Sequence, residues 1–215
     1  MSEPPRRTLM SPFVERPEEA AIIGRILAGY GEIEFFVYEC LIAVLGYPNI
    51  AARVMFRLRS ESHRLEAADA ILRATCESHD LREEYLIVFA AANYCRKLRN
   101  QYAHCHWLPE TDEGLFFCNL EESARNRSGD LILTFSHVDT KLLELQEAYC
   151  LYCMDMLLWL RGELQHSAAR LPNRRFVKPK GITQPLRHNP PELHPLPQKS
   201  RTPKRPPEPP LSETL

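Results

Sequence analysis

Residues 17–45 read PEEAAIIGRILAGYGEIEFFVYECLIAVL, and this stretch predicts one long helix. Its proline and two glutamates suit the first turn of a helix, and Gly46 and Pro48 end it. Apolar side chains recur every three or four residues and form one stripe, which consists of Ile22, Ile26, Tyr30, Ile33, Val37, Cys40 and Val44. Further apolar residues widen this surface, so we expect the helix to lie at the centre of a bundle or in a dimer interface.

Four more helices are predicted downstream of this stretch. Their ranges are 50–59, 60–76, 81–105 and 138–166. Two short β-prone runs, LFFCN at 115–119 and LILTF at 131–135, flank a polar segment that is rich in turn residues. The predicted fold class is therefore all-α: a bundle of four long helices and one short helix, with a β-hairpin inserted near residues 115–135.

Composition divides the chain into three parts. Residues 1–15 are polar and are expected to be flexible, and residues 16–168 form the predicted helical domain. The remainder, 169–215, is proline-rich and basic, with 12 prolines and a net charge of +6 within residues 171–215. The first 170 residues carry a net charge of −7. So few large apolar residues occur after 168 that we expect a disordered tail, which either attracts RNA, binds a partner as polyproline II, or only aids solubility.

The cysteines and the apolar runs indicate in which cellular compartment the protein is expected. There are 7 cysteines, an odd number, and most fall inside apolar helical runs. No secretory leader and no membrane-spanning apolar stretch is visible, so we expect a cytoplasmic protein with no membrane association. His104, Cys105 and His106 are consecutive and would point in different directions on a helix, which argues against a metal site there.

Residues 99–107, RNQYAHCHW, close the fourth predicted helix. Arg99 continues an apolar stripe with Val88, Ala92 and Cys95, so its charge needs a partner. That partner is either a carboxylate, for which Glu32 and Glu34 are the candidates, or a bound phosphate, which a guanidinium group matches well. Asn100 and His104 are four residues apart and lie on one helix face.

This motif resembles the signature of the HEPN superfamily. In that family an Arg late in a long helix is followed by a polar residue and, four to six positions beyond the Arg, by a His. Arg99, Asn100 and His104 match without a gap, and Ala103 and Trp107 are also similar to HEPN-like bacterial proteins. The resemblance covers about residues 18–166.

The resemblance implies a metal-independent endoribonuclease without a cofactor. Such an enzyme uses the 2′-hydroxyl of RNA as the nucleophile. It would need His104 as base or acid, Arg99 to bind the phosphate, and Asn100 to orient His104 or a phosphate oxygen. Tyr102, His106 and Lys97 flank the motif and are candidate RNA contacts. The family commonly forms homodimers, which would bring two histidines together, and its members include toxins and defence effectors with a cognate antitoxin.

The same residues also have plain structural interpretations. Arg99 would form an internal salt bridge, and His104 would interact with the dipole at the end of its helix. On that interpretation the protein is a non-catalytic HEPN-like module for protein assembly.

Overall fold

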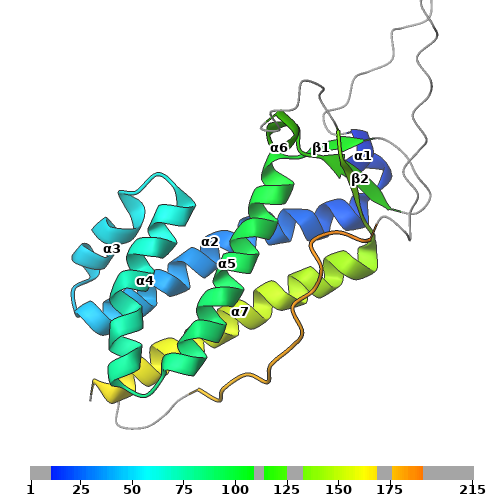
Figure 1. Cartoon of the computed structure of the whole chain (residues 1–215). Helices are drawn as coiled ribbons and strands as arrows, with labels where there is room; N and C mark the ends of the chain where they lie inside the picture. The colour runs from blue at the N-terminus through cyan, green and yellow to red at the C-terminus, as the bar shows by residue number, and fades with distance from the viewer. Residues whose placement is uncertain (1–10, 109–113, 125–132, 169–175, 191–215) are drawn as a thin grey trace, which may run out of the picture.

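The computed structural model describes residues 11–108, 114–124, 133–168 and 176–190 (Figure 1). Helices predominate, which confirms the broadly all-α class. In chain order the elements are α1 (Ser11–Glu15), α2 (Pro17–Leu45), α3 (Pro48–Phe56), α4 (Glu61–Ser78), α5 (Arg82–His104), β1 (His106–Leu108), β2 (Leu115–Cys118), α6 (Leu120–Ala124), β3 (Phe135–Val138) and α7 (Thr140–Ser167). The five predicted helices are α2, α3, α4, α5 and α7, with bounds that differ by a few residues.

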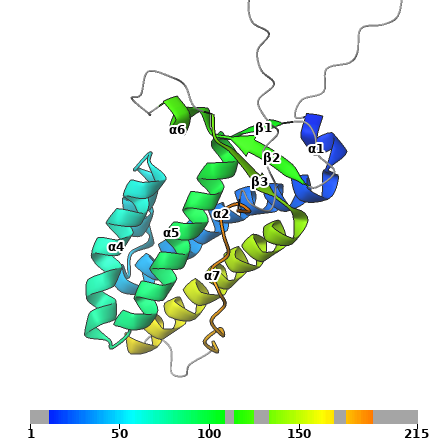
Figure 2. The same cartoon turned by 45° about the vertical axis from the view of Figure 1, so that its right-hand side comes forward.

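Helices α2 and α7 lie side by side and run in the same direction (Figures 1 and 2). Arg25 pairs with Glu147, and Glu39 pairs with Arg161. In both pairs the two residues are 122 positions apart in sequence, so the helices are parallel and keep the same register along their length. The face of α2 between them is apolar and buried, with Ile23, Ile33 and Leu41 almost inaccessible to solvent.

Helix α5 runs opposite to α2 and α7 and packs against both, while α4 lies alongside it (Figure 2). The face of α5 toward the core consists of Tyr85, Val88, Ala91, Ala92, Cys95, Leu98 and Tyr102. Helices α3 and α4 cover one end of the bundle, and the sheet covers the other. The C-terminal end of α5 therefore points toward the sheet, and this places the motif between α4 and the strands.

The sheet has the order β1-β2-β3, and both strand pairs are antiparallel. The predicted hairpin is present as β2 and β3, but its second strand is 135–138 instead of 131–135. Strand β1 was not predicted, because residues 106–108 were expected to follow a helix end. Its Trp107 packs on Phe13, Tyr102 and Phe117, and this aromatic cluster fixes the strand against the end of the bundle.

Residues 176–190, which we call the strap, have no regular secondary structure but lie along α5 and α7 (orange in Figure 1). Buried and half-buried side chains of the bundle donate hydrogen bonds to its carbonyl groups: Tyr94 to Pro185, Gln101 to Arg187, and Gln146 to Leu186. This differs from the disordered tail expected over 169–215. A proline-rich segment needs no helix of its own when the bundle supplies donors for its backbone.

Two further expectations concern the chain termini and the membrane. Residues 11–15 of the expected flexible start form α1, while 1–10, 169–175 and 191–215 lie outside the described residues. Within the described ranges, no helix combines the length and the apolar character needed to cross a bilayer.

Candidate functional site

The motif occupies the last two turns of α5, where the core-facing stripe meets the surface. Val88, Ala92 and Cys95 are buried, whereas the side chain of Arg99 is 31% exposed. The guanidinium group therefore lies at the edge of the core, with its stem packed and its head open to solvent on one side.

Arg99 is held by one nitrogen atom. Its Nη1 lies 2.8 Å from Oε1 of Glu61, the first residue of α4, and donates to Oδ1 of Asn100 at 3.1 Å. The predicted carboxylate partners were wrong: Glu34 instead accepts from Nη1 of Arg64 at 3.0 Å, and Glu32 is exposed. The packing of α4 against α5 decides this pairing, and residue spacing within one helix carries no information about it.

The other edge of the Arg99 guanidinium is available. Both contacts use Nη1, and neither Nε nor Nη2 has a hydrogen-bond partner in the parts of the chain that the structure describes. A guanidinium edge of two parallel N–H groups is the geometry that binds two oxygens of a phosphate or carboxylate. Glu61 and Asn100 thus fix the orientation of Arg99 without using that edge.

His104 is the last residue of α5, and its side chain is exposed. The imidazole makes no hydrogen bond or ion pair to any residue within 11–108, 114–124, 133–168 or 176–190. It lies one helical turn beyond Asn100, so the two side chains share a face. An unbonded, solvent-accessible imidazole keeps both ring nitrogens free for proton transfer.

The three candidate RNA contacts lie in different environments. Tyr102 is 3% exposed, stacks on Trp107 and donates its hydroxyl to Gln146, so it is a core residue and we withdraw it as an RNA contact. Its spacing from Tyr94 and Leu98 puts it on the core-facing side of α5. Lys97 and His106 are both exposed, the former on α5 and the latter in β1.

Three residues near the motif were not identified from the sequence: Glu61, Arg96 and Tyr30. No sequence signal connects Glu61 to Arg99, because the two residues are on different helices. Arg96 could have been found, since it precedes Arg99 by three residues and so lies on the same face of α5. Tyr30 was placed only in the apolar stripe of α2; it is buried, and burial together with the charges of Glu34 and Glu61 raises its pKa.

Cys105, Cys150 and Cys153 are each buried or half-buried. Cys105 follows His104 directly, and its burial raises the pKa of the thiol to about 12. Cys150 and Cys153, which have C-x-x-C spacing, are buried in α7 and are not bonded to each other. No group of three or more metal-ligating side chains was found within the ranges that the structure describes.

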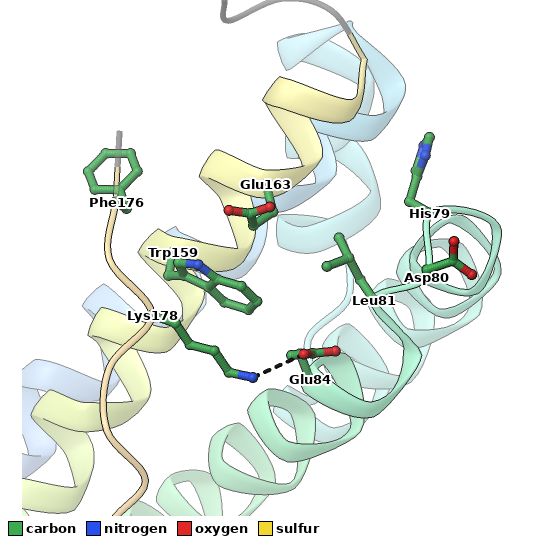
Figure 3. A pocket seen from close by; sticks show the side chains of 8 residues that line it. All are labelled: His79, Asp80, Leu81, Glu84, Trp159, Glu163, Phe176 and Lys178. Atoms are coloured by element: carbon green, nitrogen blue, oxygen red, sulfur yellow. Dashed lines mark hydrogen bonds and ion pairs between the residues drawn. The ribbon is translucent and has the colours of Figure 1, made fainter. Parts of the chain in front are cut away.

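A cavity of about 580 Å³ lies at the opposite end of α5 (Figure 3). Its walls are His79, Asp80, Leu81, Glu84, Trp159, Glu163, Phe176 and Lys178. Lys178 of the strap crosses it, with Nζ 3.0 Å from Oε1 of Glu84 and 5.3 Å from the centre of the Trp159 ring. Fifteen to twenty helical residues at 1.5 Å each put this cavity about 22–30 Å from the motif, so the two are separate.

No known family model matches this chain. Searches of curated proteins and of solved structures likewise found no match. The interpretation of the motif therefore depends on its residues and their geometry.

Proposed function

We propose that this protein is a HEPN-like, metal-independent endoribonuclease that cleaves RNA by attack of a 2′-hydroxyl on the adjacent phosphate. One observation carries the proposal: Arg99 is oriented through Nη1 while its other edge stays open, and His104 lies unbonded just beyond it on the same helix. The open edge of Arg99 and the imidazole of His104 are both accessible to a ligand from solvent.

The residues would divide the chemistry as follows. The open edge of Arg99 binds two oxygens of the scissile phosphate and stabilises the charge that develops there. His104 removes the 2′-hydroxyl proton, or protonates the 5′-oxygen as that oxygen leaves. Asn100, whose Oδ1 accepts from Arg99, keeps its amide N–H groups available for a phosphate oxygen or for His104. The products are a 2′,3′-cyclic phosphate and a 5′-hydroxyl.

The reaction needs both a base and an acid, and each chain supplies one motif histidine. A homodimer that faces the two α5 ends toward each other would supply the second histidine. We therefore propose a homodimer with RNA as its substrate, and a role as a toxin or defence effector restrained by a cognate inhibitor protein. Sedimentation showing a monomer at the concentration where cleavage occurs would contradict catalysis by paired histidines.

The experiment compares three proteins on total RNA in EDTA: wild type, His104→Ala and the matched control His79→Ala. His79 is also an exposed histidine, and it lies at the opposite end of α5, beside the cavity. We expect His104→Ala to lose roughly 10²–10⁴-fold in cleavage rate, the usual contribution of a general acid or base, and His79→Ala to stay near wild type. Equal cleavage by wild type and His104→Ala would refute this use of the motif.

One observation favours a second function, a non-catalytic assembly module. The 2.8 Å contact between Arg99 and Glu61 ties α5 to the start of α4, which is a structural task in itself. If that is the whole role of the motif, no RNA end with a cyclic phosphate will form. In that case Arg99→Ala will lower the melting temperature as much as Glu61→Ala does.

A further inference from the structure

Two buried polar atoms beside the motif lack a hydrogen-bond partner. They are the hydroxyl oxygen of Tyr30 and Nε of Arg96. Tyr30 is 4% exposed, so its hydroxyl has no access to bulk solvent. Buried polar atoms are nearly always paired in folded proteins, and an unpaired set next to a candidate site needs an explanation.

The two atoms belong to one charged cluster between α2, α4 and α5. Arg96 lies one turn before Arg99 and Asn100 on the same face of α5. Tyr30 of α2 is within electrostatic range of four charged side chains, namely those of Glu34, Glu61, Arg96 and Arg99. Arg96, Asn100 and His104 follow each other at intervals of four residues, so Arg96 extends the motif row by one turn.

The charges of the cluster do not balance. Arg64 pairs with Glu34, and Arg99 pairs with Glu61. Arg96 has no carboxylate within ion-pair distance among the described residues, which leaves three guanidinium groups against two carboxylates. Its stem is half-buried, so this cation is less hydrated than one on the open surface. A bound anion would neutralise the excess.

We propose that Arg96 is a second phosphate-binding residue of the site, and that Tyr30 positions it. The terminal nitrogens of Arg96 and the open edge of Arg99 donate to one phosphodiester of a single nucleic-acid strand. When Arg96 turns onto the phosphate, its Nε donates to the hydroxyl oxygen of Tyr30, and both unpaired atoms become satisfied. The phosphate as the ligand rests on the proposed function; the binding itself needs no cleavage.

The test therefore measures binding without chemistry. The probe is a short, fluorescently labelled RNA with 2′-O-methyl groups throughout, which has no free 2′-hydroxyl to react. Dissociation constants are measured by anisotropy over a range of salt concentrations. The variants are Arg96→Ala, Arg96→Lys, Tyr30→Phe and the control Arg53→Ala, which removes the same side chain and charge from an exposed position of α3.

We expect Arg96→Ala to weaken binding about tenfold, as for loss of a charged hydrogen bond, and to lower the salt slope by about 0.7, as for one lost phosphate contact on a single strand. Arg96→Lys keeps the charge and falls between. Tyr30→Phe weakens binding about threefold and leaves the slope unchanged, because no phosphate contact is lost. Arg53→Ala stays within twofold of wild type.

Two results would overturn the proposal: no binding of the probe by wild type, or equal effects of Arg96→Ala and Arg53→Ala. Failure of the proposed function looks different, since wild type would then bind the probe through Arg96 but cleave no unmodified RNA. Thermal unfolding of every variant separates lost contacts from lost folding, and Arg96→Lys keeps the test valid if Arg96→Ala does not fold.

Discussion

The polar groups at the two ends of α5 differ in whether they have a partner. At the N-terminal end, Glu84 is paired with Lys178 of the strap, and the ammonium group lies over the ring of Trp159 (Figure 3). At the C-terminal end, His104 has no partner among the described residues, and Nε of Arg96 is buried without one. On α5 itself, the described contacts thus include a paired charge at one end and unpaired polar groups at the other; a third buried atom without a partner, Nε of Arg161, lies on α7.

The difference indicates where a ligand is expected. At the first end the Lys178–Glu84 ion pair anchors the strap, and the cavity that Lys178 crosses is also lined by the carboxylates of Asp80 and Glu163. At the second end Nε of Arg96 is buried without a partner, which costs free energy in the absence of a ligand because the group has lost its hydration. Natural proteins retain such groups mainly where a ligand or a reaction uses them.

The largest expected effect comes from removing one cation at each end of α5. Arg99→Ala should lower the rate of RNA cleavage about 10²–10³-fold, the typical loss when one donor to a developing oxyanion is deleted. Lys178→Ala removes the same charge but should leave the rate unchanged. Single-turnover cleavage rates of the two variants give the comparison directly.

An equal loss of rate in Arg99→Ala and Lys178→Ala would contradict the difference between the two ends of α5. The loss would then come from the lower net charge and not from the position of the removed cation. Arg99→Lys supplies a further control: it keeps the charge but cannot present two parallel N–H groups, so most of the rate should still be lost.

A smaller effect is expected where α7 holds the strap. Gln146 is fully buried, binds the Tyr102 hydroxyl, and donates to the Leu186 carbonyl. Gln146→Ala leaves the buried Tyr102 hydroxyl unpaired and removes one of the two donors to the Leu186 carbonyl, so we expect a loss of about 1–3 kcal/mol in the free energy of unfolding. Urea denaturation measures this loss, and Gln101→Ala, at a more exposed position, should lose less. Cleavage activity should persist once the variant is folded, because neither Gln146 nor Tyr102 belongs to the proposed catalytic residues.

A third change removes only one hydroxyl. Tyr94→Phe deletes the donor to the carbonyls of Pro185 and Leu186 and keeps the ring, which packs on Tyr149. We expect a loss of about 0.5–1.5 kcal/mol and faster amide exchange in the strap. Exchange rates in residues 176–190 that match wild type would show that other contacts hold the strap.

The smallest effect concerns the pH dependence of the Glu84–Lys178 pair. The hydrogen bond from Lys178 lowers the pKa of Glu84 in the folded state. A lowered folded pKa gives stability that is present above the unfolded pKa, about 4.3, and is lost as pH falls through the folded value. Both side chains are partly exposed, so we expect under about 1 kcal/mol. Lys178→Ala should therefore cost more at pH 7 than at pH 2, by this amount, because the contact with Trp159 does not depend on the charge of Glu84.

The helices of this fold are predictable from the sequence because their signals are local. The start of α2 follows from Pro17, and its end follows from Gly46, whose positive φ of 75° suits a left-handed C-cap. The residues of the motif could likewise be selected, since Arg99, Asn100 and His104 lie within two turns of one helix.

The contacts between helices were not predictable in the same way. The choice of Glu61 over Glu34 as the partner of Arg99 depends on how α4 meets α5. The position of the strap likewise depends on contacts between distant parts of the chain. Its backbone accepts hydrogen bonds from Tyr94 and Gln146, which are about 40 or more residues away in sequence. The amino-acid composition of the strap predicts how this segment behaves in isolation, and it contains no information about the donors that the bundle supplies.

The parallel arrangement of α2 and α7 has a consequence for how the chain folds. Their paired charges are separated by 122 residues, a distance in sequence more typical of β-sandwich contacts than of helical bundles. During synthesis at about 5–20 residues per second, α2 must wait roughly 6–24 s for the partner that covers its apolar face. Until α7 leaves the ribosome, only α1, α3, α4 and α5 among the described helices that pack on α2 are available to cover part of its apolar surface.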